Sequence, residues 1–173
     1  MLTERPVFRS EWGGAMIIAF GNDHAGYPLK AELLQTLKEL GVEVVDFGSS
    51  GPEPVDFPDI ARRVCDAVRS GTAERGIMLC GTGIGACMAA NKIPGIRAGV
   101  CHDVHSAHQG VEHDDMNVLC LGAKIIGAWL ARDILATFIS AEFDADDEDL
   151  VRRVRKLGEL ELEAARKLAG RVG

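Results

Sequence analysis

The chain has 173 residues, of which 47% are hydrophobic, and it carries a formal net charge of −7 at pH 7. This length suits one domain with a sizeable core, and the acidic balance argues against nucleic acid or an anionic membrane surface as a partner. No apolar run reaches the length of a membrane span, and the first residues lack the apolar core of a signal peptide. Five cysteines show no disulfide-scaffold spacing, so we expect reduced thiols in a cytoplasmic protein.

Strands and helices are predicted to alternate from residue 16 onward. Residues 1–15 show no periodicity and are interpreted as an N-terminal extension. An apolar run predicts the first strand over 16–20, and leucines spaced for one helix face predict a helix over 28–40 that begins at Pro28. The same patterns predict later strands over 42–46, 76–80, 97–101 and 117–121, and later helices over 58–70, 86–91, 103–112 and 127–140.

Five strand–helix repeats with short connections predict an α/β fold. We expect a three-layer αβα sandwich with a five-stranded parallel, Rossmann-like sheet, formed by residues 16–141. Residues 142–173 differ in character, because an acidic segment leads into a charged helix that runs to about residue 170. The alternating charge of that helix suits a projecting element that packs on another subunit.

The strongest chemical signal lies where the third predicted strand ends in Cys80. The glycine loop that follows, Gly81-Thr82-Gly83-Ile84-Gly85, turns the chain into a helix of small residues. Such a turn presents backbone N–H groups that attract anions, and the positive partial charge favours the thiolate of Cys80. A cysteine base or nucleophile beside an oxyanion cradle suits chemistry on a carbonyl. By contrast, we interpret Cys87, Cys101 and Cys120 as ordinary buried thiols.

Polar residues follow most of the predicted strands directly. Because parallel strands share one carboxyl edge, where α/β sheets bind ligands, we expect these residues to converge there. They are Asp23, His24, Asp46, Cys80, His102 and Asp103.

The glycine loop also fits a dinucleotide-binding pattern in its Gly81-x-Gly83-x-x-Ala86 form. Asp103 lies about twenty residues further on, where such sites place an acid for the ribose. Against this alternative, the pattern follows the third strand rather than the first, and the chain has no room for a separate substrate domain. A nucleotide-binding module therefore remains the rival hypothesis from another functional class.

Four histidines lie close together, at positions 102, 105, 108 and 113. Their spacing matches one helix face only loosely, and no carboxylate completes a known zinc pattern around them. We therefore predict no metal site, and we expect surface histidines with one catalytic member.

Three segments taken together resemble the type B ribose-5-phosphate isomerase family, which includes galactose-6-phosphate isomerase subunits and related tetrose- and hexose-phosphate isomerases. The resemblance covers about residues 16–157. It rests on Gly21-Asn22-Asp23-His24-Ala25-Gly26, on Cys80 to Gly85 with Ala89-Ala90-Asn91-Lys92, and on Glu112-His113-Asp114-Asp115-Met116-Asn117-Val118 followed by Gly122-Ala123-Lys124.

The resemblance implies an aldose–ketose isomerase that needs no redox cofactor. Cys80 would move a proton between C1 and C2 of the sugar, and the N–H groups of the glycine loop would hold the enediolate oxygens with help from Thr82. His113 would open the sugar ring, and Asp23 would place the ring oxygens. Family members are dimers or tetramers with sites shared between subunits, so the resemblance implies a homodimer or homotetramer for this chain.

The remaining implied roles concern substrate binding, and there the sequence departs from the family pattern. His24 would approach the phosphate, and Asp114 would bind the sugar. Phe57 stands where the family often has Tyr, and Lys124 stands where an Arg commonly contacts phosphate. In the tail, Arg153 aligns with the second of two family arginines.

The first of those two arginines is replaced by Asp149. The departures cluster at the far end of the substrate, so they leave the reaction type unchanged and put the sugar in question. Ribose 5-phosphate is the default substrate. Alternatives are other four- to six-carbon sugar phosphates of the erythrulose 4-phosphate, allose 6-phosphate or galactose 6-phosphate type.

Overall fold

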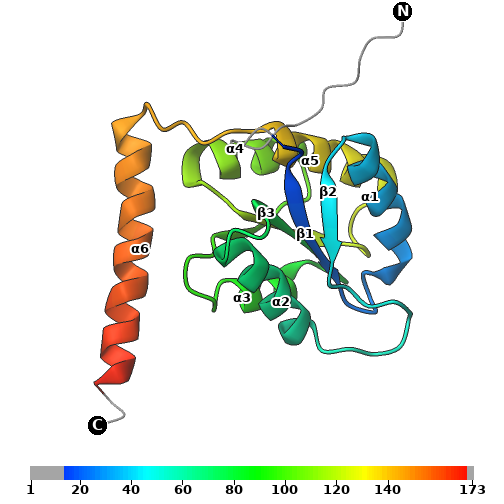
Figure 1. Ribbon diagram of the computed structural model, residues 1–173, viewed down its shortest axis with the longest axis horizontal. Coiled ribbons are helices and arrows are strands. Elements are labelled where there is room, and N and C mark those ends of the chain that lie inside the picture. Colours follow the sequence, from blue (N-terminus) through cyan, green and yellow to red (C-terminus); the bar gives the residue numbers. More distant parts are fainter. Residues whose placement is uncertain (1–13, 171–173) are drawn as a thin grey trace, which may run out of the picture.

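The computed structural model describes residues 14–170 of the chain (Figure 1). Most of the N-terminal extension that the sequence predicts, residues 1–13, therefore lies outside the described residues. Within the described part, a parallel sheet lies between two layers of helices, and one long helix stands beside this sandwich.

Five strands form a single sheet in the order β2-β1-β3-β5-β4, and every neighbouring pair is parallel. The expected five-stranded parallel, Rossmann-like sheet is confirmed. The strands are β1 (Ile17–Asn22), β2 (Glu43–Asp46), β3 (Arg75–Cys80), β4 (Ala98–Val100) and β5 (Val118–Gly122).

Five helices cover the sheet, three on one face and two on the other (Figure 1). The first face carries α1 (Tyr27–Glu39), α4 (Val104–Asp114) and α5 (Ala128–Ser140), and the second carries α2 (Phe57–Arg69) and α3 (Ile84–Ala90). Because each crossover between parallel strands is right-handed, the connecting helix lies on one face when the chain moves toward β2 and on the other face when it moves toward β4.

Two hydrophobic cores fill the space between the layers, and β3 supplies both of them. Ile77 and Leu79 join the core under α1, α4 and α5, whereas Met78 and Cys80 join the core under α2 and α3. This division follows from the period of two along a strand, which sends successive side chains to opposite faces. Because both faces are covered, the strand reads as a continuous apolar run.

Element boundaries differ from the sequence-based prediction by one or two residues. The first strand was predicted over 16–20, but β1 continues to Asn22 because its last residues still pair with β3, Gly21 with Met78 and Asn22 with Leu79. That pairing is non-local and leaves no trace in the local hydrophobic pattern.

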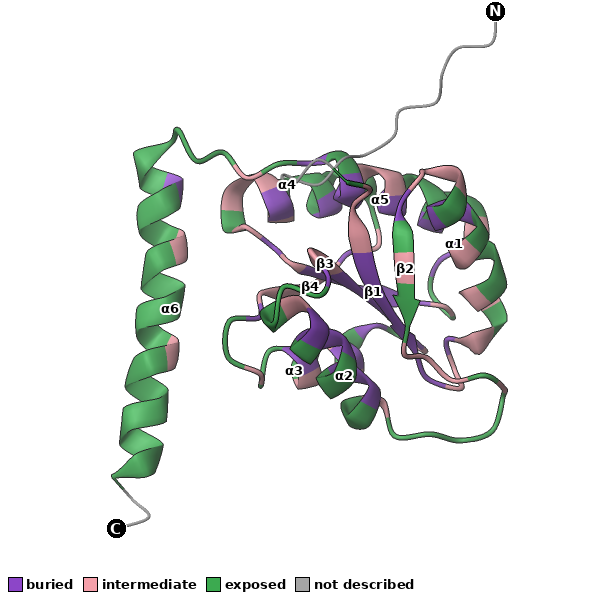
Figure 2. Ribbon diagram, in the orientation of Figure 1, coloured by how far each residue is buried: buried purple, intermediate pink, exposed green. Residues whose placement is uncertain are grey.

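The charged helix α6 (Glu148–Ala169) projects beside the sandwich as predicted (Figure 2). Leu150 is buried and Val154 half-buried, while most of the helix is exposed (Figure 2). Further along, the Glu161 carboxylate accepts a hydrogen bond from the N–H of Gly95 at 3.0 Å. Across residues 14–170, no helix has the combined length and apolarity that crossing a membrane requires.

Candidate active site

The candidate site lies at the carboxyl ends of β1 and β3. The chain passes from β1 to β2 on one side and then crosses to β3 on the other side of β1. Ligands of open parallel sheets bind in the crevice at such a switch point. The two strand ends are joined there, because the N–H of Asp23 donates a hydrogen bond to the carbonyl of Leu79 at 3.1 Å.

The glycine loop folds back onto the sulfur of Cys80. Gly83 adopts a left-handed conformation with φ of 80°, and its N–H donates to the Cys80 Sγ at 3.1 Å. The N–H of Ile84 donates to the Thr82 hydroxyl oxygen at 3.4 Å. One N–H group of the loop therefore points to the sulfur of Cys80 and another to a hydroxyl of the loop, and Cys80 is buried beside them.

The helix after this loop is short, so its dipole contributes less than the sequence suggests. The helix α3 has only seven residues, and a macrodipole grows from aligned peptide units. The anion-attracting character of the site therefore rests on the individual N–H groups of the loop.

Residues that follow β5 hold the glycine loop from the other side. The N–H of Ala123 donates to the carbonyl of Cys80 at 2.8 Å, and the N–H of Lys124 donates to the carbonyl of Gly81 at 3.0 Å. The close approach needs a glycine at Gly122, because a Cβ there would lie 2.7 Å from the carbonyl carbon of Thr82. The loop is thus fixed between β3 and β5 before any ligand arrives.

Asp23 and His24 lie beside the loop at the end of β1. The buried carboxylate of Asp23 accepts a hydrogen bond from the N–H of Gly26 at 2.9 Å. The His24 Nδ1 accepts a hydrogen bond from the N–H of Val55 at 3.3 Å. An accepting Nδ1 leaves Nε2 as the nitrogen that carries hydrogen in the neutral ring.

Phe57 and Lys124 complete the group of predicted residues at this edge. The Phe57 ring packs on Gly85, since a Cβ on Gly85 would lie 3.1 Å from Cζ of the ring. A Cβ on Gly81 would lie 3.8 Å from Cδ of Lys124 and 3.4 Å from the methyl group of Ala25. An apolar wall and a flexible cation therefore border the loop.

His113 and Asp114 lie at the opposite edge of the sheet in the same chain. They end α4, which begins after the carboxyl end of β4 and leads into the amino end of β5. Nearby, the N–H of Asn117 donates to the carbonyl of Arg97 just before β4 begins. The His113 Nε2 lies 3.5 Å from a carboxylate oxygen of Glu112. One chain alone does not bring His113 to Cys80.

Arg153 lies in the second turn of α6, also away from Cys80. The Asp149 carboxylate forms an ion pair with Arg152 and lies 3.6 Å from Nη2 of Arg153. The hydrogen bond from Arg152 holds the pKa of Asp149 below its usual value. Asp149 is therefore charged at neutral pH and contacts both arginines.

Three further residues expected at the carboxyl edge have structural partners. Asp46 forms an ion pair with Lys30 at 2.7 Å, and Asp103 caps α4 through the N–H of Ser106 at 2.7 Å. The dinucleotide hypothesis needs the Asp103 carboxylate to bind a ribose, but here it caps the N-terminus of α4. His102 Nε2 accepts a hydrogen bond from the N–H of Gly122 at 3.1 Å, so His102 supports the strand end near the glycine loop.

Within residues 14–170, no group of three or more histidine, cysteine or acidic side chains is arranged to hold a metal ion. His108 and His113 instead both lie near Glu112, with His108 Nδ1 3.3 Å from its carboxylate. These side chains are about half exposed and form weak surface pairs.

A cavity of about 510 Å³ lies elsewhere, between the edge strand β4, α4 and α6. Its polar lining includes Asp114, Arg97 and Glu161, but Arg97 is occupied by an ion pair with Asp115. Of the predicted site residues it contains Asp114 alone, and it lacks Cys80 and the glycine loop. This cavity lies under α6, away from the glycine loop.

Comparison with known families matches the model described as Ribose/Galactose Isomerase to residues 18–157. The chain belongs to the Ribose/Galactose Isomerase family. The family expected from the three sequence segments is thereby confirmed, over nearly the same residues.

Individual members of the Ribose/Galactose Isomerase family agree with this assignment. The Ribose-5-phosphate isomerase B of Escherichia coli (strain K12) is 44% identical over 127 residues, which cover 73% of this chain and 85% of that relative. The D-erythrulose-4-phosphate isomerase of Pectobacterium atrosepticum is 39% identical over 143 residues, covering 82% and 92%. The structure of Clostridium thermocellum Ribose-5-Phosphate Isomerase B superposes with a TM-score of 0.83 at 48% identity, covering 86% and 99%.

Proposed function

We propose that this chain interconverts the aldose and ketose forms of a small phosphorylated sugar through a cis-enediolate, with ribose 5-phosphate and ribulose 5-phosphate as the default pair. The position of Cys80 carries the proposal. Its sulfur lies at the switch point of the sheet and accepts the N–H of Gly83 at 3.1 Å. A base beside a cradle of N–H donors is what proton transfer next to a carbonyl needs. Relatives named as sugar-phosphate isomerases support the same reaction.

The proton transfer assigns a task to each group at the glycine loop. The Cys80 thiolate removes the C2 proton of the open-chain aldose, the C–H electrons form a C1–C2 double bond, and O1 takes the negative charge. Backbone N–H groups and the Thr82 hydroxyl stabilise that oxygen. Cys80 then returns its proton to C1, while the hydroxyl proton on O2 moves to O1. The sugar is isomerised without net oxidation, so the reaction needs no redox cofactor.

The phosphate and the sugar hydroxyls are assigned to the residues around the loop. A phosphorylated sugar is a dianion that calls for charge-assisted hydrogen bonds. Lys124, beside Gly81, supplies a point charge rather than the fork of an arginine. Asp23 places hydroxyl oxygens, and the Nε2 of His24 faces the phosphate as a donor. Phe57 closes the wall over Gly85 without offering a hydroxyl.

A second copy of the chain completes the site in this proposal. His113, Asp114 and Arg153 lie away from Cys80 in one chain, and a two-fold axis brings the far edge of one copy to the near edge of the other. The projecting α6 supports this arrangement, because it carries apolar residues that one chain leaves exposed: Val151, Leu157, Leu160, Leu162 and Leu168. The assembly is a homodimer, or a homotetramer built from such dimers.

The cysteines suit a cytoplasmic location. All five are free in the structure, and unpaired thiols persist in reducing compartments. A cytoplasmic place also agrees with a small-molecule substrate.

A turnover panel tests the proposed function. The full chain is incubated with ribose 5-phosphate, erythrulose 4-phosphate, allose 6-phosphate and galactose 6-phosphate, and aldose and ketose signals are followed by NMR. We expect conversion of at least one sugar by the wild type and none by Cys80→Ala, which controls for contaminating isomerases. Equal conversion by both proteins, or no conversion of any phosphorylated sugar, would refute the proposal.

A further inference from the structure

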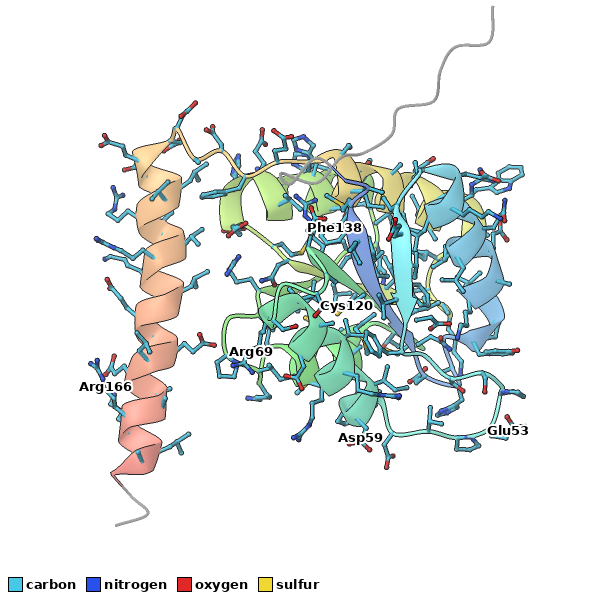
Figure 3. The ribbon with its side chains drawn as sticks, viewed as in Figure 1. Glu53, Asp59, Arg69, Cys120, Phe138 and Arg166 are labelled. Carbon is cyan, nitrogen blue, oxygen red and sulfur yellow. The ribbon has the colours of Figure 1, made fainter. Side chains whose placement is uncertain are left out.

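The loop between β2 and α2, residues 47–56, borders the candidate site but takes no part in the proposed proton transfer. It bows away from the sandwich (Figure 1), and Glu53 marks its outer bend (Figure 3). Residues 52–56 are exposed to solvent, so the contacts near the two ends of the loop determine where it lies.

Lys30, a residue of α1, holds the start of this loop. Its side chain is only 12% exposed, and its Nζ lies 2.7 Å from the Asp46 carboxylate. The same ammonium donates a hydrogen bond to the carbonyl of Ser49 at 2.8 Å. A lysine is rarely withdrawn from water unless it is paired, and both partners belong to the loop or to the strand end just before it. Lys30 therefore ties the first residues of the loop to α1.

The end of β1 supplies a second anchor for the same residues. The Asn22 Nδ2 donates hydrogen bonds to the carbonyls of Asp23 at 3.0 Å and Ser49 at 3.5 Å. In return, the N–H of Ser49 donates to the carbonyl of Asn22 at 2.8 Å. Gly48 lies so close that a Cβ there would come 1.9 Å from the Asn22 Oδ1. The start of the loop is thus packed against the strand that leads into Asp23 and His24.

The other end of the loop contacts His24 directly. The N–H of Val55 donates a hydrogen bond to the His24 Nδ1 at 3.3 Å. Between the two anchored ends, Pro52 and Pro54 each fix one backbone φ angle. A loop with so little conformational freedom carries the position of its start over to Val55.

We propose that Lys30 and the backbone N–H of Val55 are positioning groups that orient His24 toward the phosphate of the substrate. An Nδ1 that accepts the Val55 N–H carries no hydrogen itself, so the neutral ring keeps its hydrogen on Nε2. Lys30 holds the loop that delivers this N–H, and Nε2 is thereby presented as the donor. The effect on substrate binding rests on the proposed function, whereas the tautomer of His24 does not.

NMR of the full chain with 15N-labelled histidine measures the tautomer without any substrate, and His24→Gln identifies the signal. We expect the hydrogen on Nε2 in the wild type. Val55→Pro removes the N–H and Lys30→Met releases the loop, so both should raise the share of the Nδ1–H form, while circular dichroism shows that they fold. Val55→Ala keeps the N–H and should keep the wild-type tautomer. A wild-type ring with its hydrogen on Nδ1, or an unchanged ring in Val55→Pro, would overturn the proposal.

Kinetics on the sugar phosphate that the wild type converts measure the consequence for binding. Lys30→Met and Val55→Pro should each raise KM about tenfold and leave kcat nearly unchanged, as loss of a hydrogen bond to a charged group in both ground and transition states does. Lys30→Arg keeps the charge and should recover much of the affinity. Lys38→Met removes an exposed lysine from the same helix and should match the wild type.

The double variant of Lys30→Met and Val55→Pro separates positioning from direct contact with the phosphate. Its KM should be no higher than that of either single variant, because both substitutions act through one hydrogen bond to His24. Effects that multiply, an unchanged KM in Lys30→Met, or a fall in kcat alone would contradict the assigned roles. If the tautomers behave as expected but the wild type converts no sugar phosphate, only the proposed function fails.

Discussion

The backbone N–H of Gly83 donates a hydrogen bond to the sulfur of Cys80 at 3.1 Å. This contact depends on the left-handed backbone of Gly83, whose φ is 80°. A side chain there would also press on the sheet, because a Cβ would lie 3.2 Å from the carbonyl carbon of Leu121. A conformation that glycine alone adopts easily thus aims a donor at the proposed base before a substrate binds.

Cys80→Ala should abolish turnover and leave the fold intact. The substitution removes the proposed base and deletes little volume, while general-base catalysis contributes about 10²–10⁴-fold. Steady-state kinetics on the preferred sugar phosphate measure the loss, and circular dichroism with substrate titration shows that folding and binding persist. Turnover near the wild-type rate would remove Cys80 from the mechanism.

His113→Asn should impair cyclic substrates far more than open-chain ones. His113 is proposed for ring opening, and a tetrose phosphate cannot close a stable ring through its esterified terminal oxygen. The comparison is kcat/KM for ribose 5-phosphate against erythrulose 4-phosphate in the variant and the wild type. Equal losses on the two sugars would contradict the assigned role.

Mixing the Cys80→Ala and His113→Asn proteins tests whether the two residues act across subunits. A mixed dimer carries one site with both residues intact, so random reassociation should restore about one quarter of the wild-type activity. Each variant, denatured and refolded alone, is the control. If the mixture stays inactive although mixed dimers form, His113 and Cys80 do not share a site between chains.

Removal of metal ions should leave the activity unchanged. Among the described residues no group of histidine, cysteine and acidic side chains is arranged to hold a metal, and the enediolate has backbone donors instead. Activity is measured after dialysis against a chelator and again after zinc or manganese is added. If activity is lost on chelation and returns when either metal is added, the enzyme depends on a metal ion and the prediction is wrong.

Asp149→Arg should lower KM for ribose 5-phosphate. Asp149 is paired with Arg152 and Arg153, so its removal frees Arg153 for the phosphate and adds a second guanidinium. Charge-assisted hydrogen bonds contribute about 1.5–3 kcal/mol at best, which bounds the gain. Asp146→Arg makes the same charge change at an exposed position just before α6. An equal effect of both substitutions would mean that general charge, not contact, is responsible.

Alkylation of Cys87 should become faster as the pH rises through about 7, the pKa that its hydrogen bonds give it. A lowered pKa places the thiolate at neutral pH, and the rate should level off well before the usual value of 9.0. The titratable neighbours are Cys120 and Cys101. Loss of the Cys120 thiol in Cys120→Ala should move the midpoint upward. Cys65, whose pKa burial raises to about 12, serves as the internal comparison in iodoacetamide mapping.

Local patterns in the sequence determined the elements and much of the near edge of the site. Apolar runs predicted the five strands, because strands covered by helices on both faces are apolar throughout. Leucines at helical spacing predicted the first of the helices that cover them. Since parallel strands end at one edge, Asp23, His24 and Cys80 were predicted to converge, and they do. The glycine loop was recognised from local conformational needs alone. The family was predicted from three sequence segments that occur together in the expected order.

Only the tertiary structure decided how these pieces meet. The strand order places β1 beside β3, and the N–H of Asp23 therefore bonds to Leu79, the residue before Cys80. The ring of Phe57 on Gly85 is likewise a contact between distant segments. Periodicity reports which face of an element is apolar, but not which element it will face. Packing across the sheet determines which elements come into contact.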